Sequence, residues 1–366
     1  MNICLIGDSL TTLALAKNLV NKKIKVSVYC KKNPKKELIS RTIGISKDNL
    51  DFFNKEILKF RKNSAWNLNQ IEIYRNQEQK DYKILSFQEL NKTLFSMVRS
   101  DKIYNLLNAS LKKNKLFNKS LIKNNKFYDD ILKNKKYELI INCEKDNKIS
   151  KKYFFKKFEK NYHSDAITTI IKHKQINNKK AIQIFTTLGP IAFLPISKSE
   201  TSIVFSINNK KINLTEIEIK NLILKHNKKL KKIKFGKIEK FKLNFLSTRN
   251  YYHKNILLFG DSLHKIHPLA GQGFNMTLRD IKILSKIIKE KINLGLKLDY
   301  LVFEKFEQKT KHFNFIFSFG IDFIYEFFKF NNKYVNRYSN KVLIELGKNK
   351  FFNKFVCKIA DKGLSI

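Results

Sequence analysis

A chain of 366 residues with 43% hydrophobic residues can bury a substantial core and form either two domains or one large α/β enzyme. Lys and Arg number 74 against 31 Asp and Glu, and the formal net charge of +43 first suggests nucleic acid or an anionic membrane surface as a partner. The basic residues are spread from Lys17 to Lys362, without the signature of an RRM, a zinc finger or a helix-turn-helix, so we expect no nucleic acid partner.

Cysteine spacing and hydropathy indicate the compartment. The four cysteines, Cys4, Cys30, Cys143 and Cys357, lie far apart and form no CxxC pair, so neither a zinc site nor a disulfide framework is expected. The N-terminal stretch has no basic region and is interrupted by Asp8, unlike a signal peptide. No stretch offers the roughly 18 uncharged apolar residues of a spanning helix. We therefore expect a cytoplasmic protein, soluble or peripheral on the inner face of the plasma membrane.

The N-terminus predicts a βαβ unit. ICLIG, TTLALAKNL and KIKVSVYC have the patterns of a strand, a helix and a second strand. The turn of a dinucleotide-binding unit reads G-x-G-x-x-G, because small residues let the backbone approach a pyrophosphate. Here Gly7 is present, but Ser9 and Thr12 replace the later glycines, and the second strand ends in Tyr29 and Cys30 without a ribose-binding acid. The unit alone is equally compatible with a βαβ unit that binds nothing.

The middle of the chain predicts a second sheet. Residues 47–135 have the patterns of helices, short strands and loops, with 85–114 the most helical part, and KYELIINC (136–143) predicts a strand that returns to the first sheet. Alternating segments between 151 and 246, such as AITTIIKH and TSIVFSI, predict a mostly antiparallel sheet. After NILLFG (255–260), another buried strand, apolar spacing predicts an amphipathic helix from about Gln272 to Leu294.

The stretch GDSLHKIHPLAGQGFNMTLRDIKIL (260–284) joins that strand to that helix. Gly260-Asp261 places a carboxylate at the carboxyl edge of a sheet, where it suits ligand hydroxyl groups. The turn after it is rigid at Pro268 and bare at its glycines, so backbone N–H groups can approach a flat ligand. The first turn of a helix carries unpaired donors and partial positive charge, which would stabilise an anion such as a reduced flavin. Simple helix capping is the alternative explanation.

This stretch resembles the second FAD-binding motif of the class A flavoprotein monooxygenases, most closely that of the ubiquinone-biosynthesis hydroxylases, GDAAHxxHPxxGQGxNxGxxD. SRTIGIS (40–46) resembles the family segment R-x-x-x-L-S, and FTTLGPIAFLPI (185–196) is similar to the strand that forms part of the wall over the flavin. YELIINCEKDNKIS departs from the family motif G-A-D-G-x-x-S, with Glu144 in place of Asp and Lys145 in place of Gly. The matching positions of the second motif are Gly260, Asp261, His264, His267, Pro268, Gly271, Gln272, Gly273, Asn275 and Asp280.

The resemblance implies an α/β fold, with a Rossmann-like FAD-binding domain (1–150 and 247–298), a mostly antiparallel substrate domain (151–246) and a helical C-terminal segment (299–366). It implies an enzyme that uses FAD, NAD(P)H as transient reductant and O2 to hydroxylate a polyprenylated phenol or quinol precursor of ubiquinone. Pro268 would shape the pocket where oxygen reacts, and Asp261 would hold the ribityl chain. The cofactor-binding residues implied are Gly7, Ser9, Arg41, Arg99, Gly260, Asp261, Gly271, Gln272, Gly273 and Asn275.

Several alternatives stay open. Arg99 is also readily explained as a solvated surface arginine. His264 and His267 have a spacing that occurs in metal sites, but no third ligand accompanies them, so we expect no metal. The aromatic segment 313–330 either packs in the core or lies on an anionic membrane and admits a polyprenyl tail. The altered turn at Gly7 to Thr12 leaves open, as an alternative, a non-catalytic scaffold that works with other ubiquinone-pathway proteins, and a flavin-dependent isoprenoid reductase or cyclase is a further candidate.

Overall fold

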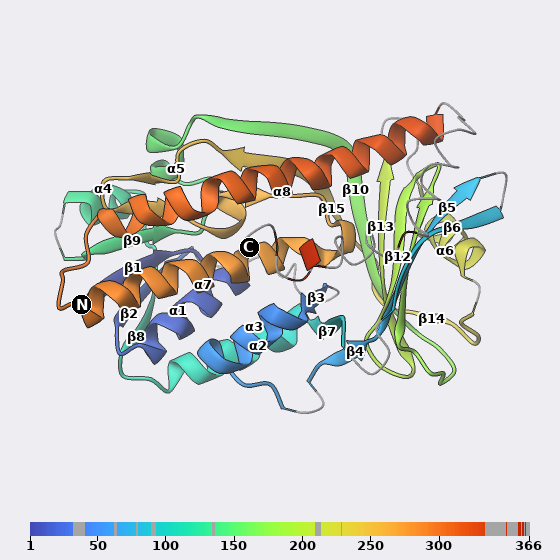
Figure 1. The fold of residues 1–366 in the computed structure, drawn as a ribbon, viewed down its shortest axis with the longest axis horizontal. Helices are drawn as coiled ribbons and strands as arrows, with labels where there is room; N and C mark the ends of the chain where they lie inside the picture. Colours follow the sequence, from blue (N-terminus) through green and yellow to red (C-terminus); the bar gives the residue numbers. More distant parts are fainter. Residues whose placement is uncertain are drawn as a thin grey trace.

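Figure 1 shows the fold in a computed structural model of the chain. The structure describes residues 1–31, 41–61, 64–77, 80–88, 93–133, 136–208, 214–227, 229–333 and positions 349, 358, 359, 361 and 363. The described strands form a six-stranded, a nine-stranded and a three-stranded sheet. The first lies at one end of the molecule and the second at the other (Figure 1).

The six-stranded sheet confirms the predicted βαβ unit. β1 and β2, which precede and follow α1 (Leu10–Asn21) in the chain, pair in parallel. The predicted returning strands β9 and β17 extend the sheet, also in parallel. β1 and β9 are buried on both faces, as parallel strands usually are. In spatial order its strands are β16 (Tyr252–His253), β17 (Ile256–Leu258), β9 (Leu139–Asn142), β1 (Asn2–Ile6), β2 (Lys25–Cys30) and β8 (Phe117–Leu121).

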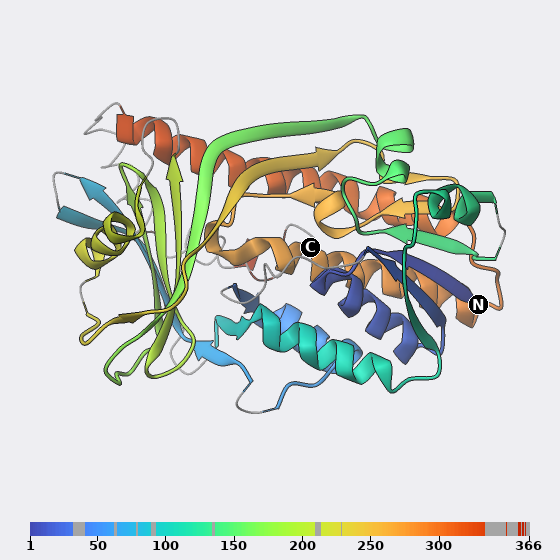
Figure 2. The same cartoon turned by 180° about the vertical axis from the view of Figure 1, so that it is seen from behind.

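The nine-stranded sheet is mostly antiparallel, as expected. Past a bulge between Asn161 and Asp165, β10 and β15 stay paired with each other and extend toward α5 (Lys148–Tyr153), as Figure 2 shows from behind. In spatial order its strands are β18 (His264–Lys265), β15 (Glu239–Thr248), β10 (Lys157–Lys172), β13 (Glu200–Asn208), β12 (Gly189–Pro195), β11 (Lys180–Thr186), β5 (Gln70–Gln77) and β6 (Lys80–Gln88), and β14 (Lys234–Phe235) pairs with β10.

Two strands of this sheet come from the range expected for the first domain. β5 pairs in parallel with β11, and β6 adds an antiparallel edge beyond it. The expected domain boundaries stay a prediction, but residues 70–88 extend the second sheet. Part of the segment expected to be most helical is also extended: it contains the end of β6 and all of β7 (Phe95–Arg99), and helix α3 begins only at Ser100 and ends at Lys112.

Side-chain alternation gives the nine-stranded sheet two different faces. On β11, Ile184 belongs to an apolar cluster with Phe193 and Ile223 of α6 (Glu216–His226). Phe185 points to the opposite face, where it packs with Phe328 in a second cluster. We call the face toward α6 the outer face and the face toward Phe328 the inner face.

The three-stranded sheet is formed by short strands from the first 100 residues of the chain. β3 (Thr42–Ser46) pairs with β7, which pairs with β4 (Trp66–Leu68). β3 runs directly into α2 (Lys47–Phe52), which is followed by one π-helical turn (Phe53–Ile57). Helix α4 (Lys126–Lys133) follows β8 and precedes β9 in the chain.

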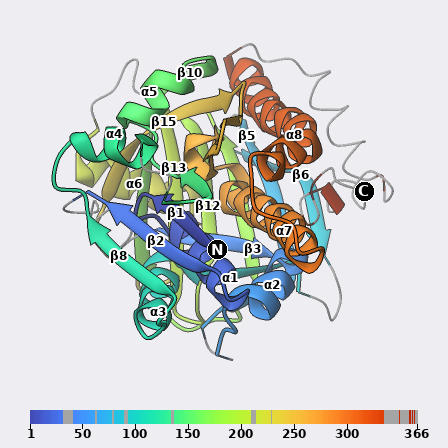
Figure 3. The same ribbon diagram turned by 90° about the vertical axis from the view of Figure 1, so that its left-hand side faces the viewer.

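Two long helices, α7 (Gln272–Asn293) and α8 (Leu301–Lys333), pack side by side, as Figures 1 and 3 show. α7 confirms the predicted amphipathic helix almost to the residue. α8 buries Phe303 and Phe306 in the main core and Tyr325 and Phe328 against the inner face. Along the described part of the chain, no helix combines the length and apolar character needed to cross a membrane.

Candidate cofactor site

The carboxyl ends of the parallel strands meet at one edge. The chain stays hydrogen-bonded past the strand ends: Gly7 N donates to Tyr29 O at 2.8 Å, and Cys143 N donates to Ile6 O at 2.8 Å. Gly7 has φ +121°, a conformation that L side chains rarely adopt. Gly260 has φ +63°, and a Cβ there would lie 2.6 Å from Thr11 Cγ2. Glycine at 260 therefore lets the end of β17 press directly against α1.

The first turn of α7 carries bare backbone donors. Its N-cap is Gly271 in the left-handed region, at φ +64° and ψ +25°, and no side chain caps the helix. A Cβ on Gly271 would lie 3.5 Å from Gly44 N of β3. At Gly273, by contrast, no neighbouring heavy atom within the described part of the chain lies within 4 Å of a Cβ position. Within the described residues, the first turn of α7 therefore borders open space on the side of Gly273 where a side chain would stand.

Asn275 fixes β3 against this turn. Its Oδ1 accepts from Ser46 N at 2.9 Å, and its Nδ2 donates to Gly44 O at 2.8 Å. The side chain is fully buried, so both of its polar groups serve the protein backbone. The role that Asn275 has here is to position β3, and a direct contact of its side chain with the cofactor stays a prediction.

Two other motif residues form a buried pair. His264 Nε2 lies 2.6 Å from Asp280 Oδ2, and Asn314 Nδ2 of α8 donates to Asp280 Oδ1 at 3.0 Å. Because His264 and Asp280 are both buried, this network ties the motif turn to α7 and α8. Within the described residues no group of three or more His, Cys, Asp or Glu side chains could hold a metal ion.

His267 and Pro268 lie where the turn meets the inner face. The His267 ring stacks on Tyr325, with centroids 4.1 Å apart, and meets the edge of Tyr162 at 5.2 Å. Burial, with a smaller contribution from Lys329, lowers the pKa of His267 to about 3, so the imidazole is neutral near pH 7. Neither of its nitrogens has a hydrogen-bond partner in the described part of the structure. Pro268 is half-buried and begins a 3-10 turn, Leu269–Gly271.

These features fit the pyrimidine and ribityl end of FAD. Asp261 is exposed after β17, and none of the described residues pairs with its carboxylate, so it can accept from hydroxyl groups. Buried polar atoms of Ser262, Gln272 and Thr42 also have no hydrogen-bond partner in the described residues. Buried polar atoms in folded proteins are rarely left unpaired. Unpaired donors and acceptors around an uncapped helix start indicate a polar ligand there.

The adenine end differs more from the usual pattern. Thr12 N donates to Ser9 Oγ at 3.2 Å, and Ser9 N donates to Thr12 Oγ1 at 3.4 Å. This capping box satisfies two of the four free N–H groups of α1, so fewer remain for a pyrophosphate. Asp8, also in the turn, is neutralised by Lys119, whose Nζ lies 2.6 Å away. Ser9 therefore serves the helix, and its cofactor contact stays a prediction.

A carboxylate does reach the end of β2, but from another strand. Glu144, which follows β9, lies with its Oε1 3.0 Å from Lys31 Nζ and accepts from Tyr128 OH at 3.2 Å. Lys31 comes directly after β2, so Glu144 lies close to the position that the usual ribose-binding acid would occupy. Tyr29, the expected acid position, instead bonds through its hydroxyl to Tyr137 OH at 2.7 Å.

The two predicted arginines have protein partners. The Arg41 guanidinium lies 4.3 Å from the ring centre of Phe241, on the nine-stranded sheet. Arg99 donates to Asp101 at 2.8 and 3.2 Å, and it lines a cavity of about 470 Å³ with Trp66 and Lys102. Their backbones are adjacent, because Ser100 N donates to Arg41 O at 2.9 Å. Contacts of these arginines with the cofactor stay predictions.

Sequence reasoning missed several residues of this site. Gly44, Tyr162, Asn314 and Tyr325 were not expected there. Gly44 could have been found from the need for a small residue opposite a glycine turn. The other three lie far from the motif in the chain, and no local pattern indicates that they meet it.

Comparisons with known proteins agree with the fold and the motif. The family model described as squalene epoxidase matches residues 147–342. The 3-demethoxyubiquinol 3-hydroxylase of Escherichia coli (strain K12) is 30% identical over 155 residues, covering 41% of this chain and 40% of that protein. The mitochondrial ubiquinone biosynthesis monooxygenase COQ6 of Dictyostelium discoideum is 33% identical over 101 residues, covering 27% of this chain and 20% of that protein. The chain thus spans less than half the length of these relatives.

Among solved structures, p-nitrophenol 4-monooxygenase PnpA from Pseudomonas putida DLL-E4 matches with a TM-score of 0.76 and 10% identity, covering 100% of this chain and 98% of that one. At this identity the likeness shows a shared fold, and it confirms the expected fold class. The resemblance to class A flavoprotein monooxygenases is confirmed as well. Because the family model covers more than half of the chain, including the motif turn and α7, the chain belongs to the squalene epoxidase family.

Proposed function

We propose that the chain is an FAD-dependent monooxygenase that uses NAD(P)H and O2 to hydroxylate the ring of a polyprenylated phenol or quinol in ubiquinone biosynthesis. One observation carries the proposal: among the described residues, the start of α7 has no side-chain cap and has open space at Gly273, and no residue pairs with the carboxylate of Asp261 at the sheet edge. The names of the two curated relatives support the pathway and the substrate class.

The residues that would hold FAD have separate tasks. Asp261 accepts from hydroxyl groups of the ribityl chain, and the first-turn N–H groups of α7 favour negative charge at the pyrimidine end. Asn275 and Gly44 keep β3 against this turn. FAD, when bound, supplies the chemistry of hydride acceptance from NAD(P)H and of oxygen activation.

The inner face supplies a dry, apolar surface beside the turn. Tyr162, Phe185 and Phe328 are buried there, and Phe185 stacks on Phe328 with ring centroids 3.8 Å apart. Such a surface would exclude water from an oxygen-activating site. Pro268 and His267 form the part of the turn that faces it. A neutral His267 can accept a hydrogen bond from a phenol hydroxyl group, but its lowered pKa makes it too weak a base to remove the proton.

The test is flavin binding followed by turnover. The purified protein, reconstituted with FAD, should show the visible flavin absorbance bands, and a polyprenylated phenol should stimulate NAD(P)H oxidation with isotopic label from O2 in the product. A stably folded protein that takes up no flavin would contradict the proposal and favour the scaffold. Flavin uptake with NAD(P)H oxidation but no labelled product would favour an isoprenoid reductase or cyclase.

A membrane surface is part of the proposal because the substrate carries a polyprenyl tail. α8 exposes Phe313, Ile316, Phe323 and Ile324; Ile316 lies three residues after Phe313 and seven and eight residues before Phe323 and Ile324, so the four share one side of the helix. The protein is strongly basic, which favours an anionic bilayer. In flotation with phosphatidylglycerol vesicles the protein should rise with the lipid, and Phe323→Ser with Ile324→Ser should reduce this. Retention of the parent protein in the lipid-free fraction would exclude membrane binding.

A further inference from the structure

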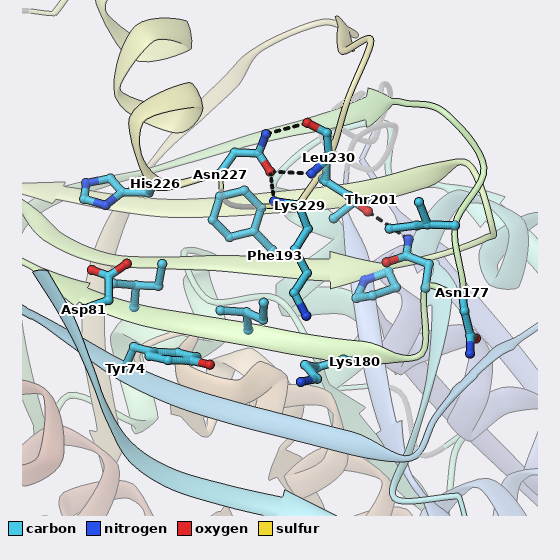
Figure 4. A pocket seen from close by; sticks show the side chains of 15 residues that line it. Tyr74, Asp81, Asn177, Lys180, Phe193, Thr201, His226, Asn227, Lys229 and Leu230 are labelled. Carbon is cyan, nitrogen blue, oxygen red and sulfur yellow. Dashed lines mark hydrogen bonds between the residues drawn. The ribbon is translucent and has the colours of Figure 1, made fainter.

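A second cavity lies on the outer face of the nine-stranded sheet, beneath the loop that follows α6 (Figure 4). Its volume is about 140 Å³, and β11 and β12 form its floor through Ile182, Ile184 and Phe193. These side chains alternate with Phe185, which points to the inner face. The cavity is therefore separated from the candidate cofactor site by the thickness of the sheet.

The size and the walls of this cavity suit a single aromatic ring. Its apolar lining consists of Ile, Phe, Pro and Leu side chains. A cavity of about 150 Å³ lined by Leu, Ile and Phe stays dry and binds benzene. The cavity on the outer face has nearly that volume, so a ring of six carbons would fill it.

Two ammonium groups enter the same space. Figure 4 shows the side chain of Lys229 directed from the loop toward Lys180, with Tyr74 to one side of them. Lys180 Nζ is held 3.0 Å from Glu72 Oε2, and Tyr74 OH donates to the same oxygen at 2.8 Å. Lys229 has no ion-pair partner in the described part of the chain.

The loop that carries Lys229 is built to hold it. Asn227 Oδ1 accepts from Lys229 N at 3.2 Å and from Leu230 N at 2.9 Å, and its Nδ2 donates to Leu230 O at 2.8 Å. These bonds are drawn in Figure 4. They fix the backbone from which the exposed side chain of Lys229 reaches the cavity.

The charges at the centre of the cavity favour an anion. Glu72 is the carboxylate beneath it, and Lys83 and Lys180 already neutralise it, with Nζ–O distances of 2.8 and 3.0 Å. Lys229 adds a further positive charge. Glu72 itself is not part of the lining. Asp81, the acid that does line the cavity, lies at the opposite end from the two lysines, beside His226 (Figure 4).

We propose that this cavity binds a small aromatic carboxylate, with the ring against Ile184 and Phe193 and the carboxylate between Lys229 and Lys180. A carboxylate bound by two ammonium groups forms charge-assisted hydrogen bonds, which are about twice as strong as neutral ones. This site is independent of the proposed monooxygenase activity and requires no cofactor.

The test uses benzoate as the probe and ligand-observed NMR titration of the full-length protein as the readout. We expect a dissociation constant on the order of 1 mM, as the size of the ligand allows. Benzyl alcohol, which lacks the charge, and acetate, which lacks the ring, should each bind at least about tenfold more weakly. Equal binding of benzoate and benzyl alcohol would overturn the role of the lysines.

Three variants locate the binding. Lys229→Gln should weaken benzoate binding at least about tenfold, whereas Lys231→Gln, an exposed lysine of the same loop outside the lining, should leave it unchanged. Ile182→Phe should abolish binding by filling the ring space. If benzoate bound the parent and both Lys229→Gln and Ile182→Phe alike, or did not bind the parent, the proposal would be wrong. Flavin absorbance of the same samples reports separately on the cofactor site.

Discussion

The substitution Gly273→Ala tests whether the open space at the start of α7 is a ligand site. Gly273 lies in the first turn of the helix, and the space where a Cβ would stand contains no neighbouring heavy atom of the described residues. Alanine in a helix is about 0.5–1 kcal/mol more favourable than glycine, so the ligand-free protein should become slightly more stable.

FAD affinity should change in the opposite direction. If the flavin packs against this turn, one extra methyl group overpacks the contact by about 1–3 kcal/mol, which corresponds to a weakening of roughly five- to 150-fold. The assay is FAD titration followed by flavin fluorescence, with thermal unfolding measured with and without FAD. Gly320→Ala is the matched control, because Gly320 is helical in α8 and also has open space around it. Unchanged FAD affinity in Gly273→Ala, with the expected gain in stability, would refute the reasoning.

Three further predictions concern the pairs and thiols described above. Asp280→Ala leaves the buried His264 and the half-buried Asn314 without their partner, so denaturant unfolding should show a loss of about 3–5 kcal/mol, whereas Glu290→Ala, at a partly exposed position of the same helix, should change little. Burial raises the pKa of Glu72, but Lys83, Lys180 and Tyr74 outweigh it and lower that pKa to about 2, below the unfolded value of about 4.3. The stability from Glu72 is therefore present above about pH 4.3 and is lost as the pH falls toward 2, so the deficit of Glu72→Gln, on the order of 2 kcal/mol, should shrink over that range; a constant deficit would contradict this. Burial raises the pKa of the Cys143 thiol to about 12, so Cys143→Ser should not alter the rate at which native protein reacts with a thiol reagent, and a slower reaction would show that Cys143 is accessible.

The sequence predicted the elements whose patterns are local. The run from Ile3 to Gly7, the apolar spacing of α7 and the alternating strands after residue 151 each contain their own signal, and the structure has them close to the expected bounds. The glycine turn was also predicted from a local pattern, and the structure adds that Gly271 has a left-handed backbone, which few residues other than glycine adopt.

What the sequence could not predict depends on partners far along the chain. The stretch from Leu85 to Gln88 has helical spacing but becomes a strand, because β5 gives it an edge to pair with. The carboxylate of Glu144 was expected to belong to an altered motif, and only the structure places it beside Lys31. Arg41 could be aligned with a cofactor-binding arginine, but its contact with Phe241 depends on how the three-stranded sheet packs against the nine-stranded sheet.

The parallel pairing of β5 with β11 has a consequence for how the protein unfolds. A fragment that began at residue 151 would lack β5 and β6, and the edge of β11 would present its free N–H and C=O groups to solvent or to another chain. The chain enters the nine-stranded sheet from several separate stretches and returns to the parallel sheet between them. Neither half can therefore be excised intact, and heating should melt both sheets in one cooperative transition, with aggregation expected of any truncated product.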